Sequence, residues 1–182
     1  MSRLSIPAVA DAPAASQPLL TAVHKKLGVV PNLMKLLSQS PAALEGYLSL
    51  SGALDKGTLD ARLRESLALA VAEFNGCDYC LAAHSYIGKN LVKLSDEQIA
   101  QARDGRAADA RNGAALRFAQ RVAAERGRVQ DADIATLRAA GFNDAETVEI
   151  VLHVALNVLT NYVNNVAHTD VDFPRVSAHT HA

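Results

Sequence analysis

The segment from Arg62 to Asn90 constrains the fold more than any other part of the sequence, because it holds two helical patterns separated by one turn. Apolar residues recur at helical intervals before the turn and again after it. Asn75-Gly76 lies between the two patterns, and such a pair typically ends one helix and reverses the chain. We therefore expect two antiparallel helices, 62–74 and about 77–90, packed side by side.

Both cysteines of the protein lie just after this turn. Cys77 and Cys80 are spaced C-x-x-C, and His84 follows four residues after the second. At about 100° per residue, these three side chains fall on one face of the second helix. In an antiparallel pair, residues equally far from the turn are neighbours, so we expect Glu65 of the first helix opposite His84. The sequence thus predicts that Glu65, His84 and Cys80 meet.

This arrangement suits thiol chemistry. A cysteine in the first turn of a helix and near a base has its pKa lowered from about 8.5 toward neutrality, which favours the reactive thiolate. A histidine oriented by a carboxylate can take the thiol proton and return it to a leaving alkoxide or thiol. A second cysteine can then close a disulfide, which keeps the oxidation reversible.

The composition favours one compact domain. The chain has 182 residues, of which 49% are hydrophobic, enough for a sizeable core. A net charge of −1 and the lack of a basic run argue against nucleic acid or an anionic membrane as a partner. The sequence shows neither a membrane-spanning apolar run nor the apolar core of a signal peptide, so we expect a cytoplasmic protein. In that reducing compartment, a lone C-x-x-C is more often catalytic or metal-binding than structural.

The rest of the chain also predicts helices and almost no strands, so the expected fold class is all-α. We expect an N-terminal arm over residues 1–15, a single helical domain over 16–176 and a disordered tail over 177–182. Caps and apolar periodicity predict about seven to nine helices in the domain. Besides the central pair, these helices are expected at 17–27, 29–38, 41–54, 95–103, 107–126, 131–140 and 144–168.

A weak internal repeat relates the central segment to the last predicted helix. At a shift of 84 residues, Glu65, Cys77, Cys80 and His84 align with Glu149, Asn161, Asn164 and His168. Similarity at a fixed period is the mark of a duplicated helical hairpin, although two amphipathic helices also align by chance. A duplication would place Asn161, Asn164 and His168 in a polar network or a pocket wall, because buried polar groups need hydrogen-bond partners.

The central residues resemble those of the alkyl hydroperoxidase D family, within the carboxymuconolactone decarboxylase-like superfamily. The resemblance rests on Glu65, on the run Cys77-Asp78-Tyr79-Cys80 and on His84, and it extends over roughly residues 30–176. It implies an all-helical fold, a homo-oligomer and a thiol peroxidase that reduces organic hydroperoxides. The chain departs from the best-known members at Tyr79, where they carry a second histidine.

The same resemblance implies a role for each reactive residue. Cys80 attacks the peroxide, Cys77 resolves the oxidised sulfur, and Glu65 with His84 forms a proton relay. Electrons would come from a dithiol reductant, either a lipoyl-bearing protein or a thioredoxin-like one, and the cycle implies no bound cofactor and no metal. The decarboxylase branch lacks the cysteine pair, so its lactone chemistry is not expected here.

The residues alone leave other interpretations open. The two cysteines, His84 and a carboxylate are also a candidate zinc site. A disulfide that controls assembly would make the protein a redox sensor or a scaffold. His84 is alternatively a core histidine, and Glu65 an exposed helix residue. Tyr79 and Phe74 are candidates for the wall of a small apolar substrate pocket, or simply packing residues.

Five other titratable residues are given no part in the predicted site. Glu73 is a rival to Glu65 as the carboxylate, but the turn that follows it should direct it into solvent. The histidines without a spacing pattern are His24, His153, His179 and His181.

Overall fold

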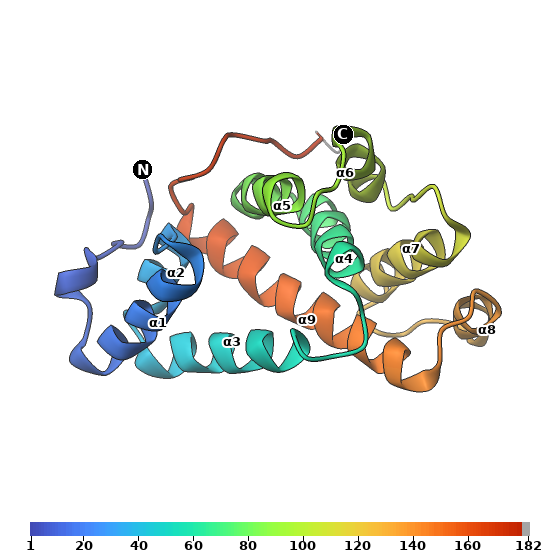
Figure 1. Cartoon of the computed structure of the whole chain (residues 1–182), viewed down its shortest axis with the longest axis horizontal. Coiled ribbons are helices and arrows are strands. Elements are labelled where there is room, and N and C mark those ends of the chain that lie inside the picture. The colour runs from blue at the N-terminus through green and yellow to red at the C-terminus, as the bar shows by residue number, and fades with distance from the viewer. Residues whose placement is uncertain (180–182) are drawn as a thin grey trace.

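The structure is a computed structural model of the chain, and it describes residues 1–179. Within these residues it contains nine α-helices, two short 3₁₀ helices and no strand, which confirms the all-α fold class (Figure 1). The α-helices are α1 (Gln17–Leu27), α2 (Asn32–Leu37), α3 (Pro41–Leu54), α4 (Ala61–Phe74), α5 (Asp78–Asn90), α6 (Asp96–Arg103), α7 (Ala110–Ala124), α8 (Asp131–Ala139) and α9 (Asp144–Ala167). In the same residues, no helix is both long enough and apolar enough to cross a bilayer.

Local capping explains why these helices begin and end where they do. The side chain of Asp60 accepts a hydrogen bond from the backbone N of Leu63 and so starts α4. Asn143 and Glu146 form a reciprocal capping box at the start of α9. Gly28, with a φ of 76°, ends α1 in the left-handed conformation that glycine adopts without steric cost.

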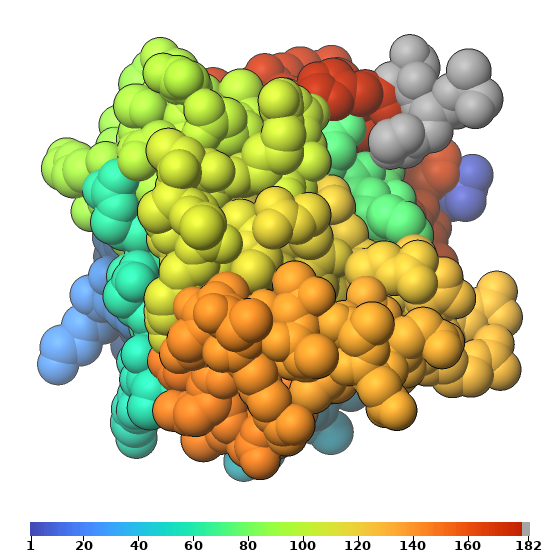
Figure 2. All heavy atoms as spheres, turned by 90° about the vertical axis from the view of Figure 1, so that its right-hand side faces the viewer, coloured from blue at the N-terminus to red at the C-terminus, as the bar shows by residue number. Residues whose placement is uncertain are grey.

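Helix α4 is the central element of the fold. It contacts α5, α6, α7 and α9, and its side chains Leu63, Leu67, Leu69 and Val71 are at most 1% exposed. Full burial of one such side chain stabilises the folded state by about 1.5–3 kcal/mol. Figure 1 shows α1, α2 and α3 on one side of α9, with α6, α7 and α8 at the opposite end. Figure 2 shows that this end is covered by residues of α6 through α8, coloured lime to orange.

The two ends of the described chain lie against the domain. The backbone N of Arg3 donates to the carbonyl oxygen of Ala167 at 2.6 Å. The carboxyl-terminal segment from Thr169 to His179, here called the strap, runs over α5 (Figure 1). We expected a disordered tail from residue 177, but Arg103 donates to the Ser177 carbonyl at 2.7 Å and the Ala178 N donates to Asp78 at 2.8 Å. The rest of that predicted tail, residues 180–182 with His181, lies outside the described residues.

The segment that repeats the central pattern is one continuous helix, α9, rather than a second hairpin. Leu159-Thr160 stands where the first copy has Asn75-Gly76, so nothing breaks the helix. Glu149, the counterpart of Glu65, accepts hydrogen bonds from the backbone N of Thr58 at 2.8 Å and of Leu59 at 3.2 Å. It therefore fixes the loop between α3 and α4.

Candidate active site

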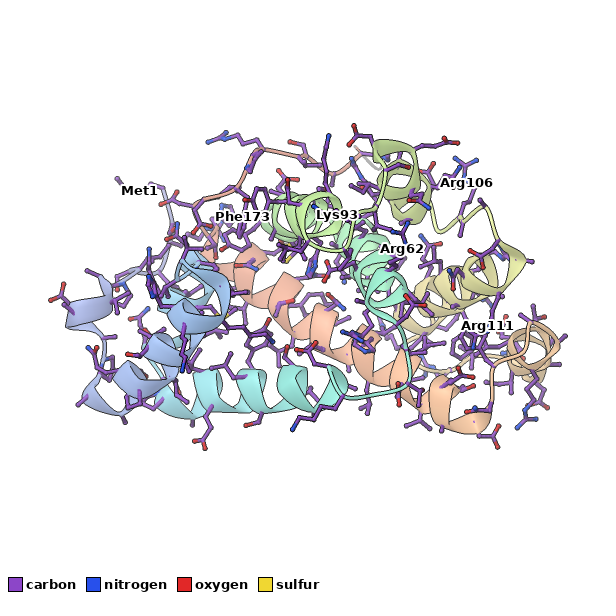
Figure 3. All side chains as sticks on the ribbon, viewed as in Figure 1. Met1, Arg62, Lys93, Arg106, Arg111 and Phe173 are labelled. Carbon is purple, nitrogen blue, oxygen red and sulfur yellow. The ribbon has the colours of Figure 1, made fainter. Side chains whose placement is uncertain are left out.

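The turn between α4 and α5 delivers the first cysteine to the start of a helix. Gly76 has a φ of 60°, a left-handed conformation that reverses the chain. The N of Cys77 then donates to the Ala72 carbonyl at 3.0 Å. Cys77 becomes the N-cap of α5, and its sulfur accepts a hydrogen bond from the N of Cys80 at 3.3 Å. At the other end of the α4–α5 helix pair, Arg62 donates to the Lys93 carbonyl at 2.8 Å (Figure 3).

The two sulfurs form a buried dithiol. The Sγ of Cys77 donates to the Sγ of Cys80 at 2.7 Å, and both cysteines are free. Cys77 is 0% exposed and Cys80 is 3% exposed. The sulfurs are close enough for a disulfide to form without a large rearrangement.

Glu65 and His84 meet across the two helices. The Nδ1 of His84 lies 2.8 Å from Oε2 of Glu65. Burial lowers the pKa of His84, but the Glu65 carboxylate and the nearby Cys80 sulfur raise it more, so its net pKa lies above the ordinary 6.5. The pairing favours an imidazolium that is oriented by a carboxylate, next to the dithiol.

Charge in the dithiol is concentrated on Cys80. Burial raises the pKa of Cys80, but the hydrogen bond from Cys77, the positive charge of His84 and the amides of Asn164 and Asn161 lower it to about 7. The pKa of Cys77 is raised, first by its hydrogen bond to Cys80 and then by burial. The pair therefore shares one proton near neutral pH, held by Cys77, while Cys80 carries the thiolate.

Asparagines from α9 and from the turn complete a polar network around Cys80. The Nδ2 of Asn164 donates to the Cys80 sulfur at 3.3 Å. The Oδ1 of Asn161 accepts from the Nδ2 of Asn75 at 2.9 Å. Asn161 and Asn164 are 0% and 2% exposed, so their amides lie inside the protein, beside the dithiol. The sequence pattern predicts for Asn75 only a place in the turn.

A cavity of about 440 Å³ opens beside Cys80. Cys80, His84 and Glu65 line it, whereas Cys77 is not among its lining residues. Most of the wall is apolar, with side chains from α1, α2, α3, α5 and α9. A substrate in this cavity would reach Cys80 first.

The strap closes one side of this cavity. Phe173 lines the cavity and packs against Tyr79 and Tyr86, with ring centroids 5.9 and 5.8 Å apart (Figure 3). The hydroxyl of Tyr79 donates to Asp172 at 2.9 Å and accepts from the backbone N of Leu33 at 3.1 Å. Tyr79, a predicted substrate-binding residue, thus lines the cavity and also joins the strap to α2.

Of the predicted substrate-binding residues, Tyr79 lines the cavity, whereas Asn161 and Asn164 lie beside the dithiol but are not among the lining residues. Phe74 and His168 lie elsewhere. Phe74 is 42% exposed and borders a separate hollow beside Phe118. It follows Glu65 by nine residues, which is about 180° around a helix, so the two side chains point in opposite directions. His168 is exposed because α9 ends at Ala167 and His168 turns away in the left-handed conformation, with a φ of 49°.

The prediction that Glu73 is solvated is wrong. Glu73 is 4% exposed, and the Nε of Arg103 donates to its carboxylate at 2.6 Å. The backbone N of His179 donates to the other oxygen at 2.6 Å. Helix α6 and the strap cover the end of α4, which the sequence pattern of α4 alone does not reveal.

His153 was missed as a residue of the site. It is 6% exposed and lines the cavity from α9. No motif marks it, because the cavity is built from helices that are distant in the sequence. Within residues 1–179, no group of three or more His, Cys, Asp or Glu side chains is arranged to hold a metal ion.

The sequence of this chain is similar to known protein families. Residues 41–125 match the model of the carboxymuconolactone decarboxylase family. An uncharacterized protein of Haemophilus influenzae is 42% identical over 52 residues, which are 28% of this chain and 46% of that protein. The match thus spans about half of that relative's length.

Solved structures are similar over nearly the whole chain. An alkylhydroperoxidase AhpD core protein of Ralstonia eutropha JMP134, described as peroxidase-related, is 28% identical with a TM-score of 0.82, covering 94% of this chain and 92% of its own. A peroxidase-related protein of Silicibacter sp. TM1040 is 27% identical with a TM-score of 0.81, covering 93% and 91%. The debrominase Bmp8, in complex with 2,3,4-tribromopyrrole, is 17% identical with a TM-score of 0.78, covering 94% of each chain, and shares the fold alone.

Proposed function

We propose that this chain, which belongs to the alkyl hydroperoxidase D-like group of the carboxymuconolactone decarboxylase family, is a thiol-dependent peroxidase that reduces organic hydroperoxides. One observation supports this most directly: the low-pKa sulfur of Cys80 lines an apolar cavity, and its partner Cys77 lies behind it at 2.7 Å. A thiolate in an apolar cavity suits attack on a hydroperoxide with an organic group.

In the first step, the Cys80 thiolate attacks the terminal oxygen of the hydroperoxide. A sulfur–oxygen bond forms and the oxygen–oxygen bond breaks, so that Cys80 becomes a sulfenic acid and the substrate leaves as an alkoxide. The protonated imidazole of His84 gives its proton to the alkoxide, which becomes an alcohol. Glu65 orients His84 and stabilises its charge, in keeping with their 2.8 Å contact.

In the second step, the Cys77 thiol attacks the sulfenic sulfur of Cys80. A disulfide forms, and the hydroxyl of the sulfenic acid leaves as water with the proton of Cys77. An external dithiol, carried by a lipoyl-bearing or a thioredoxin-like protein, then reduces the disulfide and is itself oxidised to a disulfide. No bound cofactor takes part in this scheme.

Redox sensing is the second candidate function. A dithiol beside a cavity could also be oxidised once to a disulfide, and that change could alter how the protein assembles with a partner. The two functions differ in turnover: a peroxidase consumes many equivalents of hydroperoxide per subunit, and a sensor consumes one.

The test measures loss of cumene hydroperoxide with dihydrolipoamide as the reductant. We expect many turnovers in the wild type and none in Cys80→Ser. When dihydrolipoamide is left out, Cys77→Ser should consume a single equivalent of hydroperoxide, with Cys80 trapped as a sulfenic acid. His24→Gln, an exposed α1 residue outside the cavity, is the control. Unchanged steady-state rates in both cysteine variants would falsify the proposal.

A further inference from the structure

The cavity has a second polar region, formed around His153 on α9. His153 is 6% exposed and lines the cavity, and its Nε2 is buried without a hydrogen-bond partner. Within residues 1–179, five side-chain N or O atoms are buried without a hydrogen-bond partner. Of the residues that carry them, His153 is the one that lines the cavity. A buried polar atom without a partner is costly, so a ligand that bonds to it gains affinity.

Neighbouring polar side chains on α9 already have partners. The Nδ2 of Asn157 donates to the His153 carbonyl at 2.8 Å. The hydroxyl of Thr160 donates to the Asn157 carbonyl at 3.0 Å. Each of these side chains thus has a hydrogen bond within the helix, whereas the buried Nε2 of His153 has none.

The charges around this region compensate one another. Lys26 lies 2.8 Å from Asp55, and Arg64 lies 3.5 Å from the same carboxylate. Arg64 also donates to the Leu59 carbonyl at 2.6 Å, while Glu65 is paired with His84. The pKa of His153 is lowered, first by burial and then by Arg64, so its imidazole is neutral at pH 7. Glu149 also acts on His153, and its carboxylate is held by the backbone N–H groups of Thr58 and Leu59. Because the charges near His153 already have partners, an uncharged ligand group fits better than an ion.

The two polar regions lie far apart along α9. Asn164 contacts Cys80, and His153 comes eleven residues earlier. At a rise of about 1.5 Å per residue, that separation is roughly 16 Å along the helix axis. Leu33, Met34 and Ile87 are among the apolar side chains of the remaining wall. A ligand that reaches from Cys80 to His153 therefore passes an apolar part of the cavity wall.

We infer that His153 binds an uncharged hydroxyl or carbonyl oxygen at the far end of an extended apolar hydroperoxide, whose peroxide group faces Cys80. This inference rests on the proposed peroxidase function, and it names the class of substrate: medium-length apolar hydroperoxides with a neutral oxygen at the opposite end. His153 is here a specificity-determining residue that takes no part in the oxidation.

The test fixes one end of a probe at Cys80 and does not depend on peroxidase turnover. N-octyl iodoacetamide and its ω-hydroxyoctyl analogue both alkylate a thiolate, forming a carbon–sulfur bond and releasing iodide. In the Cys77→Ser background Cys80 is the one cysteine, and its alkylation rate is measured by mass spectrometry. His153→Phe removes the hydrogen bond and keeps a ring in place, while His153→Gln keeps a donor and acceptor.

We expect His153→Phe to slow alkylation by the hydroxylated reagent about tenfold, the effect of one lost buried hydrogen bond, and to change the octyl reagent less than about twofold. His153→Gln and the control His24→Gln should keep the wild-type ratio of the two rates within about threefold. An equal change for both reagents, or no change for either, overturns the inference. If circular dichroism shows that His153→Phe does not fold, His153→Leu takes its place.

Steady-state kinetics of His153→Phe with hydroperoxide substrates distinguish an effect on KM from an effect on kcat. The KM for an ω-hydroxyoctyl hydroperoxide should rise about tenfold in His153→Phe with kcat unchanged, while the KM for octyl hydroperoxide stays the same. A wild type that reduces neither hydroperoxide would refute the proposed function and leave the alkylation result standing. A rate loss shared by both substrates would refute the role of His153 in specificity.

Discussion

The hydrogen bond from Asn164 to Cys80 makes a quantitative prediction about the reactive thiolate. The Nδ2 of Asn164 donates to the Cys80 sulfur at 3.3 Å, from a side chain that is 2% exposed. This donor stabilises the charged form of the sulfur, so its removal in Asn164→Ala should raise the pKa of Cys80 above about 7. Asn164→Leu tests the same loss with less change in packing.

The size of the effect follows from the strength of the bond. A hydrogen bond to a charged group contributes about 1.5–3 kcal/mol, and a sulfur acceptor at this distance belongs at or below the lower limit. One pKa unit corresponds to about 1.4 kcal/mol, so we expect a rise of about one unit. At pH 7 the thiolate fraction would fall from about one half to about one tenth, and the alkylation rate about fivefold. At a pH well above both values the two rates should converge.

The assay is the pH profile of Cys80 alkylation by iodoacetamide, resolved by mass spectrometry. The wild-type rate should rise with pH through a midpoint near 7 and then level off, because the thiolate is the nucleophile. Asn112→Ala, on α7, is a matched control that should keep this midpoint. A midpoint that stays in place in both Asn164 variants, or moves to lower pH, would refute the account of how Cys80 is activated.

Three further predictions concern the relay, the core and the strap. In Glu65→Gln the pKa of His84 should fall, because the carboxylate that raises it is gone; nuclear magnetic resonance titration should show the imidazolium lost at a lower pH, and the peroxidase rate should drop about 100-fold. Leu69→Ala should lower the free energy of unfolding in urea by about 2–5 kcal/mol, because Leu69 is 0% exposed in the central helix. Asp172→Ala should speed tryptic cleavage after Arg175 severalfold, because Asp172 holds the strap.

Each of these predictions has a control on the surface. Glu97→Gln and Asp131→Ala change exposed residues of the same types, and Val148→Ala truncates an exposed apolar residue. All three should leave the corresponding measurements near the wild type. An unchanged His84 titration in Glu65→Gln would mean that the 2.8 Å contact has no electrostatic effect. A stability loss below about 1 kcal/mol in Leu69→Ala would argue against the central place of α4. Equal cleavage with and without Asp172 would show that other contacts hold the strap.

The local part of this architecture could be predicted from the sequence. Most helix boundaries follow from caps and apolar periodicity, although α2 and α7 each begin three residues later than expected. The contact of Glu65 with His84 follows from counting residues outward from one turn. The register argument works there because both residues belong to one hairpin, in which geometry is fixed by short-range rules. The repeat at 84 residues also led to the prediction that Asn164 lies in a polar network or a pocket wall, and Asn164 donates to the Cys80 sulfur.

The non-local part could not be predicted in the same way. The cavity collects side chains from helices that are far apart in the sequence, so His153 had no pattern that distinguished it from a surface histidine. Glu73 is buried because α6 and the strap pack over the end of α4, a contact that periodicity within α4 does not encode. Phe74 shows an avoidable error, because its angular position relative to Glu65 already placed it on the opposite face of the helix.

The burial of the two cysteines restricts how a disulfide between them could be reduced. Cys80 is the sulfur that borders the cavity, while Cys77 is buried behind it, and the proposed disulfide would be reached from the same side. An incoming thiol must therefore travel down the cavity and attack Cys80, with Cys77 as the leaving group. A dithiol on a long flexible group, such as a lipoyl group, would fit that route. A thiol on the surface of a folded protein would reach Cys80 only if the first turn of α5 opened.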